Sequence, residues 1–237
     1  MHVGKVLSET AKRIPQKTAV IFKDEEITFS QLELRATRLA NKLRSYNVGS
    51  GDHVAIILPN SSQWVVSDFA VMKLGAVAVP LDFRLKGEEI VPILTDASIK
   101  GIIASDLYPE VTVFSQVASI SSVIITGEKG TGSFSRYEDV VSDESLSSAV
   151  EVDITEEEEA LYLYTSGTTG KPKGVVLAFS NLDLFPEGMH EVLGTREEDI
   201  LGCLLPMSHI SGPIMCNEFV LRGSTLFIFD QLRPDKI

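Results

Sequence analysis

The order of apolar and polar positions predicts a chain in which strands and helices alternate. Short apolar runs rich in β-branched residues, typical of buried strands, occur at residues 18–22, 26–29, 53–58, 76–80, 101–104, 123–126, 161–164, 175–177, 200–205 and 225–229. Apolar residues at helical spacing lie between many of them, at residues 30–43, 63–74, 88–95 and from residue 181 onward. This alternation predicts an α/β fold of mainly parallel sheets flanked by helices.

Turn and cap signals sharpen the prediction near the N-terminus. Residues 23–25 are polar and separate two apolar runs, which indicates a β-hairpin. Ser30 and Glu33 have the spacing of a capping box, so a helix is expected to begin there. One apolar face of that helix is formed by Leu32, Ala36, Leu39 and Leu43.

Composition and charge narrow the classes of partner. The 237 residues are 44% hydrophobic, which is ordinary for a globular chain with a sizeable core. Lys and Arg number 21 against 33 Asp and Glu, so the net charge of −12 disfavours nucleic acid and anionic lipid. No apolar run reaches the ~18 residues of a transmembrane segment, and no signal peptide is apparent. A cytoplasmic location is expected by default.

The cysteines and most histidines carry no motif. Cys203 and Cys216 are the only cysteines, and their spacing fits neither a disulfide framework nor a zinc site. We expect both to be small core residues. His2, His53 and His190 are interpreted as surface or structural residues, and no metal-ligating residues are predicted.

Most of the candidate chemistry lies in the stretch YTSGTTGKPKGVV at residues 164–176. Glycines let the backbone approach a ligand closely, and consecutive backbone N–H groups form an anion-binding concavity. Hydroxyls add donors, and lysines add positive charge. The stretch is therefore predicted to cradle phosphates through Thr165, Ser166, Gly167, Thr168, Thr169, Gly170, Lys171, Lys173 and Gly174.

This stretch matches neither of two common nucleotide-binding motifs. A Walker A loop has glycine six residues before its lysine and Ser or Thr after it, whereas here Thr165 precedes and Pro172 follows Lys171. Residues 164–176 also lack the Gly-x-Gly of a dinucleotide-binding loop. Both a P-loop NTPase and a dinucleotide enzyme are disfavoured.

The stretch resembles, nearly position for position, the signature loop of the adenylate-forming (AMP-binding) superfamily. That superfamily includes acyl- and aryl-CoA synthetases, peptide-synthetase adenylation domains and beetle luciferases. Residues 27–43 and 71–85 resemble its opening strand and helix and its LKAGAVYVPLDP segment. The resemblance covers the chain from residue 5 onward. It implies that the loop holds the β- and γ-phosphates of ATP, with Mg²⁺ as cofactor and CoA as cosubstrate.

The segment LPMSHISGP at residues 205–213 resembles the CoA-synthetase pattern LPxxHxxG, with His209 at the histidine. The resemblance implies that His209 lies between the acyl pocket and the ATP phosphates and helps to position the carboxylate. Peptide-synthetase domains carry an aspartate where this chain has Ile210, and an apolar residue cannot pair a substrate's α-ammonium. A small-molecule carboxylic acid without an α-amino group is therefore favoured. Further candidates at the acyl entrance are Ser208, Ser211 and Gly212.

The resemblance implies an N-terminal portion of an acyl-CoA synthetase-like enzyme. Such an enzyme activates a fatty or aryl acid to an acyl-adenylate and then to acyl-CoA. The family's magnesium-binding glutamate, ribose-binding aspartate and adenylation lysine have no counterpart in this sequence, so the chain alone is expected to be inactive. Two alternatives stay open: a peptide-synthetase-type or carrier-protein-loading adenylating enzyme, and a non-catalytic nucleotide-binding module.

The resemblance also implies a division into parts. Residues 1–47 are expected to form an opening hairpin and helix that pack with a second subdomain. Residues 48–199 are expected to form the first α/β subdomain, including the phosphate loop at 164–176. Residues 200–237 would begin the second subdomain.

A second subdomain that is only partly built should leave an unpaired sheet edge and uncovered apolar surface. We therefore predict that the chain self-associates through this edge. Light scattering at high protein concentration should report a mass above the 25.9 kDa of one chain. A clean monomer under those conditions would contradict the prediction.

Overall fold

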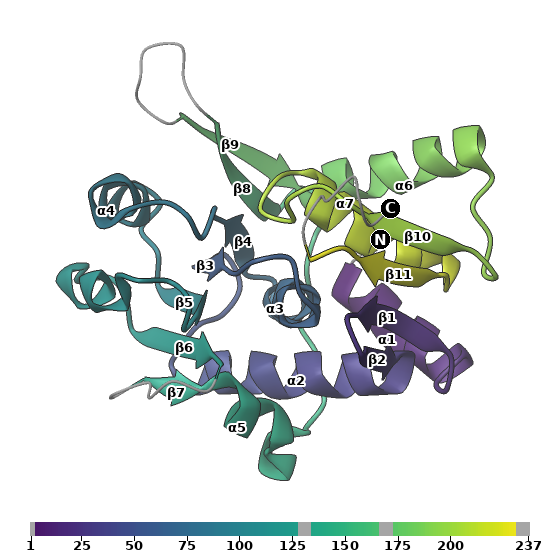
Figure 1. Cartoon of the computed structure of the whole chain (residues 1–237), viewed down its shortest axis with the longest axis horizontal. Coiled ribbons are helices and arrows are strands. Elements are labelled where there is room, and N and C mark those ends of the chain that lie inside the picture. Colours follow the sequence, from purple (N-terminus) through teal and green to yellow (C-terminus); the bar gives the residue numbers. More distant parts are fainter. Residues whose placement is uncertain (1–2, 128–133, 166–172, 231–237) are drawn as a thin grey trace.

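The computed structural model describes residues 3–127, 134–165 and 173–230. Two sheets, each flanked by helices, make up the fold (Figure 1). The larger sheet has the strand order β7-β6-β5-β3-β4-β8-β9, and the smaller has the order β10-β11-β1-β2. The predicted fold class, mainly parallel α/β sheets flanked by helices, is confirmed.

The larger sheet is parallel except at one edge. Its strands are β3 (His53–Ile57), β4 (Val77–Pro80), β5 (Gly101–Ser105), β6 (Ser122–Thr126), β7 (Ser135–Arg136), β8 (Glu159–Thr165) and β9 (Lys173–Ala178). Neighbours from β7 to β8 all pair in parallel, whereas β9 runs antiparallel to β8. The carboxyl ends of β3, β4 and β8 therefore lie along the same edge of the sheet.

The smaller sheet joins the two ends of the sequence. It consists of β1 (Thr18–Phe22), β2 (Glu25–Thr28), β10 (Ile200–Cys203) and β11 (Thr225–Ile228). The predicted hairpin is present, since β1 and β2 pair antiparallel, and β1 also pairs in parallel with β11, with Val20 opposite Leu226. This pairing supports the proposed grouping of residues 1–47 with residues 200–237. The division into subdomains stays a prediction.

Helices cover both faces of the larger sheet. The helices that the structure describes are α1 (Val3–Arg13), α2 (Phe29–Ser45), α3 (Ser62–Lys73), α4 (Gly87–Asp96), α5 (Tyr137–Ser142), α6 (Phe179–Leu193) and α7 (Ser211–Arg222), with 3₁₀ turns η1 (Val111–Gln116) and η2 (Glu144–Leu146). Helix α7 packs on β10 and β11 of the smaller sheet. Val54 and Ile56 of β3 belong to one core with α2, α3 and α5, and Ala55 and Ile57 belong to another with α4 and η1. This division follows the period of two in a strand.

The cap of α2 differs from the one expected at Ser30. Thr28 is the N-cap, its hydroxyl accepts from the Gln31 N–H at 3.3 Å, and the Gln31 side chain accepts from the Thr28 N–H at 2.9 Å. The helix follows β2 without a linker, so the last strand residue takes the cap position. Glu33 instead pairs with Lys73, whose Nζ lies 2.8 Å from its carboxylate.

The residues expected to be structural have structural partners. Cys203 and Cys216 are buried, as predicted. The Nδ1 of His53 lies 2.6 Å from the Ala97 carbonyl, and that of His190 lies 3.1 Å from the Thr195 carbonyl. His2 lies outside the described residues. In the described ranges, no helix combines the length and apolar character needed to cross a membrane.

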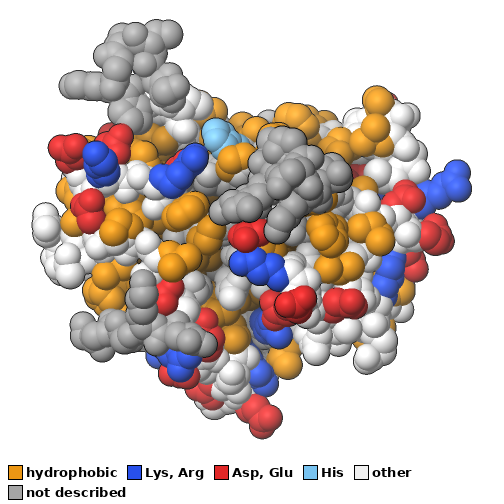
Figure 2. Space-filling model, in the orientation of Figure 1, with side chains coloured by type: hydrophobic (Ala, Val, Ile, Leu, Met, Phe, Trp, Pro, Cys, Tyr) orange, Lys and Arg blue, Asp and Glu red, His pale blue; other side chains and the backbone are white. Residues whose placement is uncertain are grey.

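Helix α6 presents apolar side chains to solvent. The exposed residues on it are Leu184, Phe185, Val192 and Leu193. They line a shallow apolar groove together with Gly188 and Met189. Figure 2 shows hydrophobic side chains at the surface in this region, while charged side chains of both signs are intermixed elsewhere on the same face. Self-association stays a prediction.

Asp68 is a carboxyl group in the centre of the core. It lies on α3 and is 1% exposed, and neither of its oxygens has a hydrogen-bond partner among the described residues. Burial raises the pKa of Asp68 to about 7, because the charged form is poorly solvated there. The neutral acid is therefore the form that the core favours.

This burial predicts a pH-dependent stability. The folded state keeps the Asp68 proton between about pH 4 and pH 7, where the unfolded chain has lost it, so the free energy of unfolding falls as pH rises through this window. Asp68→Asn removes the titration. Urea denaturation should show the variant more stable than wild type at pH 8, by about 2–4 kcal/mol, with the difference shrinking toward pH 4. A difference independent of pH would contradict this assignment.

Candidate functional site

The carboxyl ends of strands from both sheets meet at one place. The loop after β3 contains Asn60, whose Nδ2 donates to the carbonyls of Leu205 at 2.9 Å and Phe229 at 3.4 Å. Leu205 follows β10, and Phe229 follows β11. In open α/β sheets, ligands bind beyond the carboxyl ends of the strands. The junction of the two sheets is therefore the place where a site is expected.

A tight loop carries His209 to this junction. Residues 204–210 link β10 to α7, and the Met207 side chain is buried while that of His209 is exposed. The His209 N–H donates to the Pro206 carbonyl at 3.1 Å, and the Gly212 N–H donates to the His209 carbonyl at 3.0 Å. The loop is thus anchored on its inner side and presents the imidazole outward.

A carboxylate from the larger sheet lies near this imidazole. Asp82 follows β4 after one residue, and its oxygens accept from the Arg84 guanidinium at 2.9 and 2.6 Å. The hydrogen bond from the Arg84 side chain holds the pKa of Asp82 below its usual value, and His209 adds a smaller electrostatic contribution. The end of β4 therefore places the Asp82–Arg84 ion pair within electrostatic range of His209.

The predicted phosphate loop begins at the same edge. Thr165 ends β8, Lys173 begins β9, and the Thr165 hydroxyl donates to the Lys173 carbonyl at 3.4 Å. Gly174 pairs with Tyr164, whose hydroxyl donates to the Asp96 carboxylate at 2.6 Å and ties the hairpin to α4. The remaining predicted loop residues lie outside the described residues: Ser166, Gly167, Thr168, Thr169, Gly170 and Lys171.

Residues 7–237 match the family described as AMP-binding enzyme. This chain belongs to that family. A naringenin synthase from Pestalotiopsis fici is 32% identical over 99% of the chain, which spans 9% of that relative. The long-chain-fatty-acid–CoA ligase FadD13 of Mycobacterium tuberculosis is 29% identical over 100% of the chain, which spans 46% of it.

The fold agrees with this family. A solved structure of the anthranilate–CoA ligase AuaEII in complex with anthranoyl-AMP matches 97% of the chain and 45% of its own length, with a TM-score of 0.89 and 25% identity. The chain therefore spans less than half of the length of these AMP-binding relatives. It corresponds to their N-terminal part.

The described part of this AMP-binding chain offers no dedicated metal site. Within the described ranges there is no group of three or more His, Cys, Asp or Glu side chains that could hold a metal ion. We therefore assign none of these residues to Mg²⁺.

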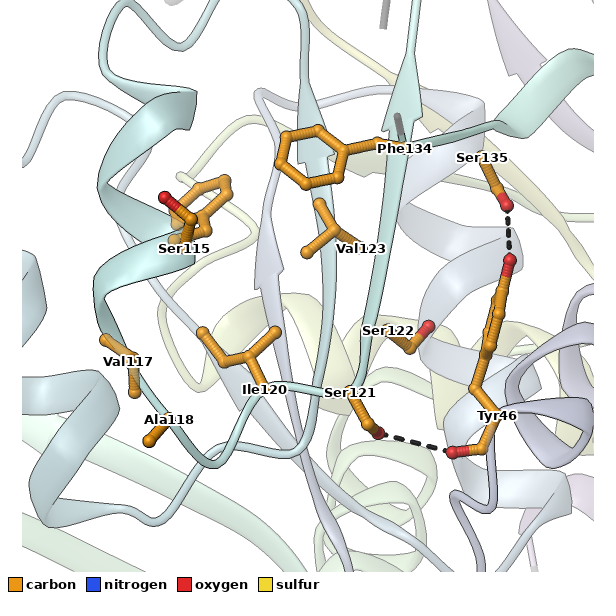
Figure 3. A pocket seen from close by; sticks show the side chains of 11 residues that line it. Tyr46, Ser115, Val117, Ala118, Ile120, Ser121, Ser122, Val123, Phe134 and Ser135 are labelled. Carbon is orange, nitrogen blue, oxygen red and sulfur yellow. Dashed lines mark hydrogen bonds between the residues drawn. The ribbon is translucent and has the colours of Figure 1, made fainter. Parts of the chain in front are cut away.

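A hollow of about 360 Å³ lies away from this junction, at the amino end of β6. Figure 3 shows the Tyr46 hydroxyl pointing to Ser135 and the Ser121 hydroxyl pointing to the Tyr46 carbonyl. These contacts, at 2.7 and 3.2 Å, fasten the sheet edge to the end of α2. The described residues that line it include no charged side chain.

Sequence reasoning missed Asn60 and Asp82 as members of the site. Both come directly after buried apolar runs, Asn60 in Leu-Pro-Asn and Asp82 in Pro-Leu-Asp. A polar residue just beyond a parallel strand was the available signal. The segment around Asp82, within residues 71–85, was used only as a family resemblance, and Asn60 was assigned no role.

The packing of Gly212 predicts a steric requirement in the His209 loop. A Cβ at Gly212 would lie 2.2 Å from the Met207 carbonyl oxygen and 2.7 Å from its Cα, so backbone must move. We expect Gly212→Ala to lower the free energy of unfolding by about 2 kcal/mol. The control Gly188→Ala, on α6 with open space around it, should raise it by about 0.5–1 kcal/mol. Urea denaturation of both variants measures this, and wild-type stability of Gly212→Ala would contradict it.

Proposed function

We propose that the protein containing this chain activates a carboxylic acid with ATP and transfers it to CoA. In the first step a carboxylate oxygen bonds to the α-phosphorus of ATP, and the bond from that phosphorus to pyrophosphate breaks. In the second step the CoA thiol bonds to the acyl carbon, AMP leaves and the thiol proton passes to solvent. One observation carries the proposal: in an AMP-binding chain, the phosphate-loop strands, Asp82 and the His209 loop lie at the carboxyl ends of the strands.

The phosphate loop has a role in the first step. Negative charge builds on the departing pyrophosphate, and donors already oriented toward it stabilise the transition state. Thr165 and Lys173 mark the two ends of the loop, and its backbone N–H groups and lysines are assigned to the β- and γ-phosphates. Mg²⁺ as cofactor would supply further charge neutralisation in this step.

His209 is assigned to the carboxylic acid. Its exposed side chain stands on an anchored loop, which suits a group that orients a substrate carboxylate. Asp82, at the end of β4, is within electrostatic range of His209. We assign His209 to positioning and charge stabilisation, with no proton transfer in the first step.

The apolar residue Ile210 indicates which class of carboxylic acid is activated. It is half-buried and packs against the main core, so an α-ammonium group would find no partner there. We propose a fatty or aryl acid that lacks an α-amino group. The relatives named as long-chain-fatty-acid–CoA ligase and anthranilate–CoA ligase support these two classes.

ATP–pyrophosphate exchange tests the proposed function. The assay would compare the chain of residues 1–237 alone with the chain joined to any coding sequence that follows it, across fatty, aryl and amino acids. We expect exchange by the longer protein with fatty or aryl acids and none by the chain alone. His209→Ala should lower kcat/KM for the acid about 10- to 100-fold. His190→Ala, which removes a structural hydrogen bond, should retain activity.

Other outcomes would overturn the proposal in distinct ways. Exchange confined to α-amino acids would favour a peptide-synthetase-type enzyme. Acyl transfer to a carrier protein in place of CoA would favour a carrier-loading enzyme. No exchange in either form, together with ATP binding, would leave a non-catalytic nucleotide-binding module.

A further inference from the structure

The side chain of Asn60 makes three hydrogen bonds that connect the larger sheet to the smaller one. Its Nδ2 donates to the Leu205 and Phe229 carbonyls, and its Oδ1 accepts from the Met207 N–H at 2.8 Å. The amide therefore contacts the loops after β10 and β11 while belonging to the loop after β3. A donor and an acceptor are both needed here, and among side chains of this size only asparagine supplies both in a planar group.

The backbone that carries Asn60 is itself fixed. Ser61 is the N-cap of α3, accepting from the Trp64 N–H at 3.2 Å and donating to the Pro59 carbonyl at 3.0 Å. Trp64 is fully buried, and α3 lies between the two sheets. The backbone at Asn60 is therefore held in place by hydrogen bonds at the start of α3.

Two of the three groups that Asn60 binds, the Leu205 carbonyl and the Met207 N–H, belong to the His209 loop. Leu205 and Met207 lie on either side of Pro206, whose carbonyl accepts the His209 N–H. Met207 is buried beneath the loop and packs against Gly212 at the start of α7. A shift of residues 205–207 would therefore carry the His209 imidazole with it.

We infer that Asn60 is a positioning residue that sets His209 relative to Asp82 and the phosphate-loop edge of the larger sheet. The inference rests on the proposed function for the role of His209. Asn60 acts through the backbone of the loop and need not touch a substrate. The bridge also fixes the spacing between the two sheets at the place where their strand ends meet.

Asn41 provides a matched control. Its Nδ2 donates to the carbonyls of Leu146 and Ser148, each at 2.7 Å, and joins α2 to the η2 region. Asn41→Ala removes the same kind of double donation away from the His209 loop. Asn60→Asp is a milder variant of Asn60→Ala, because it keeps an acceptor for the Met207 N–H while losing both donors.

The first readout does not depend on activity. Amide hydrogen exchange and the imidazole signals of labelled histidine would be measured on the chain, with His209 assigned through His209→Gln. In Asn60→Ala the Met207 amide should exchange about tenfold faster, and the His209 signals should shift and broaden. Asn60→Asp should retain part of the Met207 protection. Asn41→Ala should change neither. An unchanged Met207 amide and His209 signal in Asn60→Ala would overturn the inference.

The second readout uses the extended protein. Asn60→Ala should lower kcat of acid-dependent exchange and raise KM for the acid, with kcat/KM falling about 10- to 100-fold, as for His209→Ala. Asn41→Ala should keep both constants. Normal kinetics in Asn60→Ala despite a displaced loop would overturn the inference. If the wild-type extended protein shows no ATP–pyrophosphate exchange, the proposed function is contradicted. The inference about Asn60 would then be tested by the His209 signals and the Met207 amide alone.

Discussion

Helix α3 is buried on nearly every side, and the polar groups that it carries into the core must find partners inside the protein. Every residue of α3 except Gln63 is buried. Lys73, with a side chain only 4% exposed, places its Nζ 2.8 Å from both Glu33 and Ser8, which fixes α2 and α1 around α3. A buried ammonium without such partners would cost several kcal/mol, on the order expected for an unpaired charge. Asp68 meets the same constraint by favouring its neutral form.

This central helix determines where the site can form. It begins just after β3 and packs in the core that both sheets share, so its N-terminal turn reaches the strand ends of the smaller sheet. The smaller sheet gains its other two strands because the chain returns after α6, where β11 pairs with β1 and β10 pairs with β11. Thr10 strengthens the return by donating to the Val220 carbonyl at 3.0 Å. The His209 loop is therefore placed by long-range contacts.

The sequence predicted what depends on local patterns. Residues 101–104 were expected as a strand and lie within β5, and the face formed by Leu32, Ala36, Leu39 and Leu43 is buried as the helical spacing implies. Helix α1 was missed because its charged residues obscure the few apolar positions that pack. Helix α7 was missed because its Gly and Pro suggest a loop, although proline suits a first helical turn.

Long-range contacts could not be predicted in this way. The two carbonyls that Asn60 binds lie 145 and 169 residues away along the chain, and no local spacing encodes them. The proximity of Asp82 to His209 likewise depends on how the two sheets pack. The capping box failed for a related reason, since the position of β2 and not the serine–glutamate spacing decides where α2 begins.

We propose that nucleotide binds where the carboxyl ends of the two sheets meet. Backbone amide chemical shifts recorded with increasing ATP would test this proposal. We expect the largest changes at the loop ends Thr165 and Lys173, around Asp82 and in the His209 loop. Changes confined to the hollow beside Tyr46, or to the apolar groove of α6, would contradict it.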